Sequence, residues 1–112
     1  MTKPVRLLHG EIKTPPLTLG ARRKLGFLLR KLQEGLSLSL PDSRPMPDIE
    51  SGCHELRVGD EVHEWRLVYS IEPDAILVLE VFKKSTRQTP TKVKESCRKR
   101  VRDYRRLVQE GQ

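Results

Sequence analysis

Residues 53–82, CHELRVGDEVHEWRLVYSIEPDAILVLEVF, decide the fold of this chain. Three runs within this stretch, at 53–58, 63–71 and 75–82, are rich in valine, isoleucine, leucine and aromatic residues. Gly-Asp and Pro-Asp turn signals separate the runs. The pattern predicts three strands joined by two hairpins, which together form an antiparallel meander.

The first hairpin is expected to turn at residues 60–61. This turn places Glu55 opposite Arg66 and Arg57 opposite Glu64. Because successive side chains of a strand point to opposite faces, these four charged residues share one face of the hairpin. The other face is expected to be apolar and to hold Leu56, Val58, Trp65 and Leu67.

The second hairpin is expected to turn at residues 73–74, which places Lys83 opposite Glu64 on the charged face. Arg57, Arg66 and Lys83 then converge. Two guanidinium groups and a lysine are suited to hold a phosphodiester, and a nearby carboxylate is suited to accept a proton. The alternative interpretation is a set of ordinary cross-strand ion pairs on a solvent-exposed sheet, each worth about 0.2–1 kcal/mol.

The segments before the meander add a strand and a helix. Residues 5–9, VRLLH, predict a short strand, and the Lys-Thr-Pro-Pro stretch that follows ends it because proline cannot continue a ladder. Apolar residues at three- and four-residue spacing then predict an amphipathic helix from Thr18 to Gly35. Residues 37–52, with three prolines, are expected to form an irregular connection.

A second helix is expected after Pro90. Its apolar residues recur at steps of four, four, three and four, at Val93, Cys97, Val101, Tyr104 and Val108. The remaining faces of this helix are basic. The order of elements is therefore βαβββα, an α+β fold in which both helices pack on the sheet, and a length of 112 residues fits a single domain spanning 1–112.

The composition excludes several classes of protein. Hydrophobic residues make up 36% of the chain and charged residues 33%, but the apolar residues are clustered and periodic, so global disorder is not expected. No apolar run approaches the roughly 20 residues of a membrane span, and the N-terminus has no signal-peptide pattern. Two widely spaced cysteines, Cys53 and Cys97, do not support a disulfide framework or a Cys-rich zinc site. A soluble cytoplasmic protein with reduced thiols is expected.

The positive charge lies at the C-terminal end. Residues 1–82 contain 11 Lys or Arg against 12 Asp or Glu, whereas residues 83–112 contain 11 against 3. Neutralisation of phosphates by such a segment supplies most sequence-independent affinity for nucleic acid, so nucleic acid is the leading class of partner. Other interpretations are a solvated basic helix, a contact with an acidic protein and, less favoured, a membrane surface.

Three blocks of sequence resemble a known family. They are Cys-His-Glu-Leu-Arg at 53–57, Trp-Arg-Leu-Val-Tyr at 65–69 and Val-Phe-Lys-Lys-Ser-Thr-Arg-Gln-Thr-Pro at 81–90. In this order, and followed by a basic helix, they resemble RelE/HigB-type toxins of bacterial type II toxin–antitoxin systems, in particular the phage-derived branch. The resemblance implies a small α+β fold and a metal-independent endoribonuclease that cleaves mRNA, usually in the ribosomal A site. It also implies an antitoxin, a small helix-turn-helix protein encoded in the same operon.

The resemblance also implies roles for individual residues. Arg66 matches a strand arginine that contacts the scissile phosphate, and Arg57 matches a second basic position. Lys83, Lys84 and Arg87 match a basic loop after the last strand. In this family the ribose 2′-OH attacks the adjacent phosphate, which needs a base, cations for the developing charge, and an acid for the 5′-oxygen.

The general base and the wider RNA contacts are less defined. Glu55 is favoured over His54 as the base, because strand alternation places His54 on the apolar face. Further RNA contacts are expected from a group of residues in and before the last helix and from that histidine: Arg87, Lys92, Lys94, Arg98 and His54. No metal or other cofactor is expected.

Aromatic residues are interpreted as core. Trp65 and Phe82 are expected to pair on the Leu56 side of the sheet rather than to stack on bases, and Tyr104 lies on the apolar stripe of the last helix. Two other functions stay open at this point. One is a toxin of the same fold that inhibits a protein such as DNA gyrase without nuclease chemistry, and the other is a basic nucleic-acid-binding accessory protein.

Overall fold

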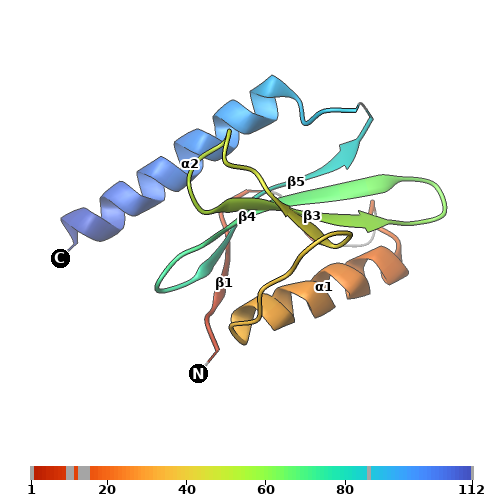
Figure 1. The fold of residues 1–112 in the computed structure, drawn as a ribbon, viewed down its shortest axis with the longest axis horizontal. Helices are drawn as coiled ribbons and strands as arrows, with labels where there is room; N and C mark the ends of the chain where they lie inside the picture. Colours follow the sequence, from red (N-terminus) through yellow and green to blue (C-terminus); the bar gives the residue numbers. More distant parts are fainter. Residues whose placement is uncertain (1, 10–11, 13–15, 86, 112) are drawn as a thin grey trace.

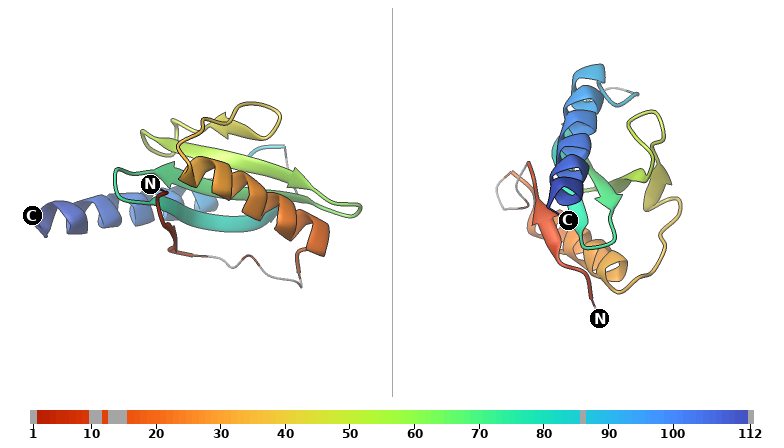
Figure 2. Two further views of the ribbon diagram at one scale, coloured as in Figure 1. Left: turned by 90° about the horizontal axis from the view of Figure 1, so that it is seen from below. Right: turned by 90° about the vertical axis from the view of Figure 1, so that its left-hand side faces the viewer.

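A mixed five-stranded sheet lies between two helices in the computed structural model, which describes residues 2–9, 12, 16–85 and 87–111 (Figure 1). The elements in chain order are β1 (Val5–Leu7), α1 (Leu19–Gln33), β2 (Ser43–Pro45), β3 (Cys53–Gly59), β4 (Glu64–Ile71), β5 (Ile76–Lys84) and α2 (Thr91–Glu110). The strand order is β1-β5-β4-β3-β2, with β1 parallel to β5 and the other neighbours antiparallel. Figure 2 shows α1 and α2 on opposite faces of this sheet. The predicted α+β class and the antiparallel meander are confirmed.

The first helix follows its sequence pattern closely. Thr18 is the N-cap, and its hydroxyl accepts a hydrogen bond of 3.1 Å from the backbone N–H of Ala21. Gly35 follows the last turn with a φ of 89°, a left-handed conformation that a residue with a side chain rarely adopts. The Lys-Thr-Pro-Pro stretch expected to end the opening strand lies, apart from Pro16, outside the described residues.

The expected irregular connection contains a strand. Ser43–Pro45 forms β2, which pairs antiparallel with β3 at the edge of the sheet, so the observed order is βαββββα. The strand is too short to show periodicity, and its proline is tolerated because it lies on an edge strand. Its position is supported by a long-range contact, a hydrogen bond of 2.6 Å between the hydroxyl groups of Ser43 and Tyr69.

The first hairpin has a longer loop than expected. Gly59 pairs with Glu64, and the carboxylate of Asp60 accepts hydrogen bonds from two backbone N–H groups of the loop, at 2.8 and 2.6 Å. The expected pairing of Arg57 with Glu64 is therefore wrong, and Arg57 lies opposite Arg66. The register differs by two residues, and a shift by an even number leaves every side chain on its expected face.

The second hairpin begins as expected and then departs from the prediction. Its turn is closed by a hydrogen bond of 2.8 Å from the Glu72 N–H to the Ala75 carbonyl, but the register shifts between Val68 and Tyr69. Beyond this bulge Glu64 lies opposite Lys84, not Lys83. A shift by one residue exchanges the two faces of a strand, so this part of the prediction is wrong.

The same bulge moves an aromatic residue. Phe82 lies opposite Arg66 and packs with the residues under α2, whereas Trp65 belongs to the core under α1. The expected pairing of Trp65 with Phe82 on one face is therefore wrong. Lys83 lies opposite Trp65 and is exposed.

Both faces of the sheet bury apolar residues. Under α1 the core includes Leu25, Leu28, Leu56 and Leu67, and under α2 it includes Val68, Leu77, Leu79, Cys97 and Val101. The face expected to be charged is therefore covered along most of its length by α2. Beyond the N-terminal end of α2 this face keeps the charged residues of the first hairpin, Glu55, Arg57, Glu64 and Arg66.

Helix α2 begins directly after Pro90, as predicted, and buries Cys97 and Val101 against the sheet. Both cysteine thiols of the chain are free and buried, and burial raises the pKa of Cys53 to about 11 and that of Cys97 to about 12. Within the described ranges, neither helix combines the length and the apolar character needed to cross a membrane.

Candidate nucleic-acid interface

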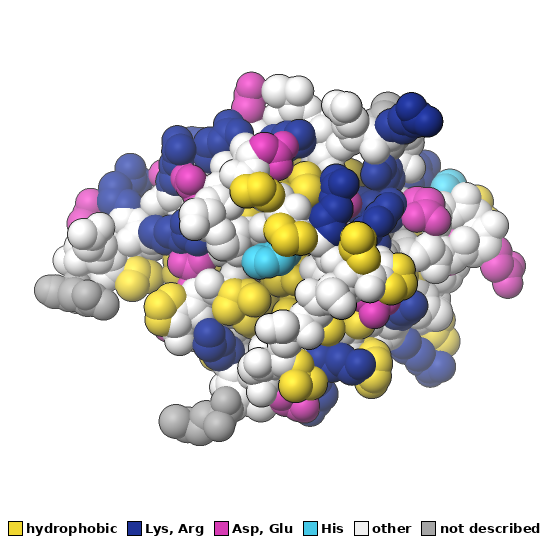
Figure 3. Space-filling model, in the orientation of Figure 1, with side chains coloured by type: hydrophobic (Ala, Val, Ile, Leu, Met, Phe, Trp, Pro, Cys, Tyr) yellow, Lys and Arg dark blue, Asp and Glu magenta, His cyan; other side chains and the backbone are white. Residues whose placement is uncertain are grey.

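One cation from each of four neighbouring strands lies on the α2 side of the sheet. We call Arg44 of β2, Arg57 of β3, Arg66 of β4 and Lys84 of β5 the cation row. The strand pairing places all four on one face, because Arg44 pairs with Glu55, Arg57 pairs with Arg66, and Lys84 pairs with Glu64. Figure 3 shows Lys and Arg side chains gathered on this part of the surface, beyond the N-terminal end of α2.

The members of the row are close enough to act on one another. Burial lowers the pKa of Lys84, and the positive charges of Arg66, Arg57 and Arg44 lower this pKa further. The Glu55 carboxylate acts in the opposite direction. Like charges held together in this way favour the binding of an anion, which relieves their repulsion.

One member of the cation row, Arg66, forms a buried ion pair with Glu55. The side chains of Glu55 and Arg66 are 0% and 3% exposed, and Arg66 Nε lies 3.0 Å from Glu55 Oε1. The contact is close but does not have the angles of a hydrogen bond, so it is an ion pair between two buried charges. Thr89 Oγ1 donates a hydrogen bond of 2.8 Å to the other oxygen, Glu55 Oε2. Such a pair holds the arginine in one place, because neither buried charge is stable without the other.

A second carboxylate meets Arg66 from the solvent side. Arg66 Nη1 donates hydrogen bonds to Glu64 Oε2, at 3.1 Å, and to the Trp65 carbonyl, at 3.0 Å. The Glu64 side chain is 65% exposed, in contrast to the sealed carboxylate of Glu55. Arg66 therefore connects a buried carboxylate to a surface carboxylate.

A polar hollow of about 390 Å³ adjoins the row. Its walls come from β2, from the segment after it, from the segment before α2, and from the first turn of α2: Arg44, Pro45, Met46, Asp48, Arg87, Gln88, Thr89 and Lys94. Lys94 forms an ion pair with Asp48 across the hollow. Thr89 belongs both to this hollow and to the buried pair, so the hollow and the row form one continuous polar site.

Residues 16–102 match the model of a family described as phage derived protein Gp49-like (DUF891). The chain belongs to this family. The match spans the three blocks of sequence singled out above, both helices except the end of α2, and every residue of the cation row. The family is toxin-like and related to RelE and HigB toxins. No curated protein matches this Gp49-like chain.

The Gp49-like fold brings together most of the predicted catalytic residues. Glu55, Arg57, Arg66 and Lys84 lie on one face, within the four-strand region described above. Lys83 does not join them, because the bulge in β4–β5 pairing turns its side chain to the α1 side. Its expected convergence with Arg57 and Arg66 is therefore wrong.

The residues predicted to contact RNA are spread more widely over the Gp49-like chain. Arg87 and Lys94 line the polar hollow, and Lys92 is exposed on the first turn of α2. Arg98 donates hydrogen bonds of 2.8 and 2.7 Å to the carbonyls of Ile49 and Asp48, so it fastens this segment to α2.

His54 lies on the opposite face from Glu55, as strand alternation predicts. It is half-buried and stacks on Tyr69 with ring centroids 5.3 Å apart. Its Nδ1 lies 3.2 Å from the Gly52 carbonyl. These contacts place it under the α1 side of the sheet, away from the cation row.

Three residues of the site were missed by the sequence analysis. Arg44 lies in a strand of three residues, too short to show periodicity. Thr89 approaches Glu55 only through the tertiary fold, although it precedes Pro90 in a block that had been noted. Glu64 was predicted only as a cross-strand partner of Arg57 and Lys83, whereas in the structure its carboxylate accepts a hydrogen bond from Arg66.

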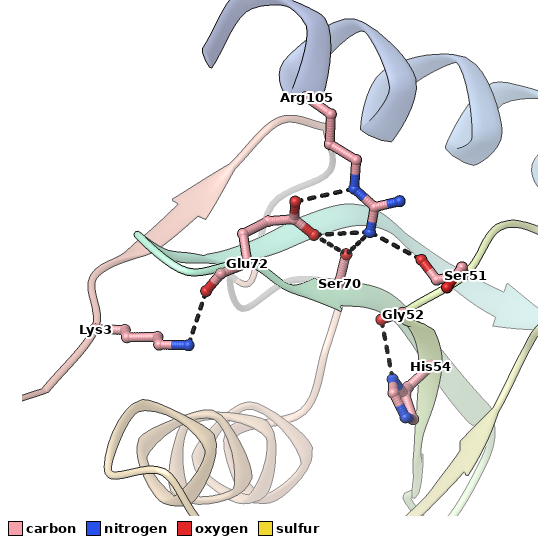
Figure 4. Close-up of polar contacts among 7 residues, drawn as sticks. All are labelled: Lys3, Ser51, Gly52, His54, Ser70, Glu72 and Arg105. Carbon is pink, nitrogen blue, oxygen red and sulfur yellow. Dashed lines mark hydrogen bonds and ion pairs between the residues drawn. The ribbon is translucent and has the colours of Figure 1, made fainter. Parts of the chain in front are cut away.

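A separate polar cluster fixes the other end of α2 (Figure 4). Arg105 donates to both carboxylate oxygens of Glu72, at 2.9 Å each, and to the Ser51 carbonyl at 2.8 Å. The hydrogen bonds to Glu72 raise the pKa of Arg105. These hydrogen bonds attach the C-terminal half of α2 to the residue that follows β4 and to the segment before β3.

The donor groups of the site do not form a metal centre in the part of the chain that is described. Among those residues no three His, Cys, Asp or Glu side chains lie together as metal ligands would. The positive charge in the site is supplied by side chains.

Proposed function

We propose that this chain is the toxin of a type II toxin–antitoxin system and a metal-independent endoribonuclease. It cleaves mRNA in the ribosomal A site, where the ribose 2′-OH attacks the adjacent phosphate, and so inhibits translation. The observation that carries the proposal is the cation row: four cations from four strands converge on one face, next to a polar hollow.

The row suits a phosphodiester under attack. Negative charge grows on the phosphate oxygens in the transition state, and fixed cations stabilise that charge best when they need no rearrangement. Glu55 and Thr89 hold Arg66 in this way from below. Arg44 is exposed, and Arg57 and Lys84 are half-buried, so these three present their charges toward an incoming phosphate.

The polar hollow suits a flanking nucleotide. Its volume of about 390 Å³ is within the range of small-molecule sites, roughly 300–1,000 Å³. Arg44 and Arg87 supply charge for a neighbouring phosphate, and the polar walls supply hydrogen-bonding groups for a base or ribose.

The partners in this proposal are mRNA on the ribosome and a cognate antitoxin. The relation of the Gp49-like family to RelE and HigB toxins supports a small helix-turn-helix antitoxin encoded in the same operon. An acidic segment of the antitoxin placed over the cation row would neutralise it and prevent access of RNA.

The test is primer extension on defined mRNAs in a translating extract, with and without an elongation inhibitor that keeps the A site occupied. Wild type is compared with Arg57→Ala, and with Arg23→Ala as a matched control, an exposed arginine on α1 at the opposite face. We expect cuts at fixed codon positions that disappear in Arg57→Ala and under A-site blockade, and that persist in Arg23→Ala. Growth arrest without any cut would overturn the nuclease and favour a toxin that inhibits a protein target.

A further inference from the structure

We propose that Glu64 and Lys84 are the general base and the general acid of this site, with Glu64 taking the proton of the 2′-OH and Lys84 protonating the 5′-oxygen. The inference rests on the proposed ribonuclease function and assigns its proton transfers. It also assigns Glu55 to a different task, the positioning of Arg66.

Access separates the two carboxylates. Glu55 is 0% exposed, and its two oxygens face Arg66 and Thr89. A general base must reach within about 2.6–3.2 Å of the proton that it removes. The carboxylate of Glu64 is 65% exposed on the same face, so a ribose hydroxyl can approach it from solvent without any rearrangement of the core.

Arg66 fixes the position of Glu64. Arg66 Nε lies 3.0 Å from Glu55 Oε1, and Nη1 donates hydrogen bonds to the Trp65 carbonyl, at 3.0 Å, and to Glu64 Oε2, at 3.1 Å. A hydrogen bond to one carboxylate oxygen leaves the second oxygen for a ligand.

Lys84 lies directly across from Glu64. The two residues are Cα partners of β4 and β5, so their side chains leave the sheet on the same face. The carboxylate of Glu64 lies next to Arg66 and Gly59, so it is directed toward β3 rather than toward β5. Burial, and after it the charges of the three arginines of the cation row, lower the pKa of Lys84 against the opposing effect of Glu55. A lower pKa makes the Lys84 ammonium a better proton donor. A phosphate bound in the row is therefore flanked by an acceptor and a donor of protons.

The proton transfers balance across one step. Glu64 removes the proton from the 2′-OH while the 2′-oxygen forms a bond to phosphorus. The bond between phosphorus and the 5′-oxygen breaks, and the Lys84 ammonium gives its proton to that oxygen. The products are a 2′,3′-cyclic phosphate and a free 5′-OH, with the proton on Glu64 and the neutral Lys84 amine returning to their starting states through solvent.

The charged groups that surround Glu64 come from each neighbouring strand. They are Arg57 on β3, Arg66 on its own strand and Lys84 on β5. All three are cations, so the proposed proton acceptor stands in a positive field that attracts the anionic RNA backbone.

The experiment measures single-turnover cleavage of ribosome-bound synthetic mRNA at the position mapped by primer extension, with oxygen or sulfur as the 5′ leaving atom. Glu64→Gln is expected to slow cleavage by about 10²–10⁴-fold with either leaving atom and to remove the acid limb of the pH–rate profile. Lys84→Ala is expected to slow cleavage much more with oxygen than with sulfur. A departing thiolate needs no proton, so with sulfur only the loss of the lysine charge from the cation row is felt.

Two matched controls use neighbouring residues of the same types. Glu61 is an exposed carboxylate in the loop before β4, and Lys83 is an exposed lysine on the opposite face, so Glu61→Gln and Lys83→Ala should retain the wild-type rate. Affinity for mRNA with a 2′-deoxy residue at the cleavage position should be unchanged or slightly tighter in Glu64→Gln, because a negative charge is removed.

The possible contrary results are distinct. If the wild-type protein cleaves and Glu64→Gln cleaves at a rate within about threefold of wild type, Glu64 is not the general base. If the sulfur substrate does not reduce the effect of Lys84→Ala, Lys84 is not the general acid. Either result overturns the assignment but leaves the proposed nuclease function intact. Loss of affinity for the 2′-deoxy mRNA in Glu64→Gln would make Glu64 a binding residue instead. No cleavage by the wild-type protein would overturn the nuclease itself.

Discussion

Thr89 donates a hydrogen bond of 2.8 Å to Glu55, a residue 34 positions earlier in the chain. The bond joins the segment before α2 to the centre of the sheet, and both side chains are buried. Glu55 in turn holds Arg66. The geometry of the cation row thus depends on a hydroxyl group outside the sheet.

Replacement of Thr89 by valine should lower both stability and cleavage. The variant keeps the side-chain shape but removes the hydroxyl, so a buried carboxylate oxygen loses its donor, at a cost of about 1–3 kcal/mol. Urea denaturation gives the change in the free energy of unfolding. Thr91→Val, at an exposed position two residues later, is the control, and equal stability of the two variants would contradict the role of Thr89.

Disruption of the buried ion pair should cost more. Glu55→Ala leaves the Arg66 guanidinium buried without its carboxylate, which should destabilise the protein by about 3–5 kcal/mol. The double variant Glu55→Leu with Arg66→Met removes both charges and should recover much of this loss. Chemical denaturation of the single and double variants checks the prediction, and additive losses would show that the pair is not coupled.

The salt dependence of RNA binding should report the contacts of individual cations. Each side chain that neutralises one phosphate adds about 0.7 to the steepness of log K against log salt concentration for a single strand. Removal of one such side chain should therefore make the slope shallower by about 0.7. Arg44→Ala and Arg87→Ala should each reduce the slope by about this amount, because both exposed side chains line the polar hollow. Titrations at several salt concentrations supply the slopes. An equal reduction in Arg23→Ala, on the opposite face, would argue for unspecific charge instead.

The first hairpin should loosen at low pH. Hydrogen bonds from the His63 and Val62 backbone N–H groups lower the pKa of Asp60 to about 2, from an ordinary value of 3.8. A folded-state pKa below the unfolded value stabilises the native state above about pH 3.8, and this contribution is lost as the pH falls toward 2.

Trp65 gives a local signal for that change. Its indole N–H donates to Asp60 at 3.0 Å, and it is the one tryptophan in the sequence. Tryptophan fluorescence should therefore change between pH 4 and 2, and Asp60→Asn should reduce this pH dependence. A profile identical to that of wild type would contradict the role of Asp60 in holding the loop.

The two thiols should be unreactive in the native protein. Burial raises the pKa of Cys53 to about 11 and of Cys97 to about 12, so the reactive thiolate is scarce at neutral pH. Alkylation followed by mass spectrometry should give slow modification of both cysteines in buffer and rapid modification in denaturant. Fast native-state labelling would show that the α2 side of the core opens readily.

The helices, the strands other than β2, and the division of side chains between the faces of the first hairpin could be predicted from the sequence. The spacing of Leu25, Leu28 and Leu32 on α1, and the alternation around Leu56 and Trp65, are local patterns that follow from the periods of a helix and a strand. Face assignment survived the error in the first register because that shift is even. Arg57 and Arg66 were therefore placed on the correct face.

The rest of the site depends on contacts between distant parts of the chain. The bulge in the β4–β5 pairing selects Lys84 over Lys83, and no local pattern marks it, because both lysines are equally polar. The burial of Glu55 and Arg66 arises from the segment before α2, which approaches through Thr89. The sequence by itself determined the helices and the longer strands with their periodicity, since these are properties of neighbouring residues. Only the tertiary structure decided which charged side chains are buried and which are exposed to solvent, because desolvation of a group depends on all the residues that pack around it.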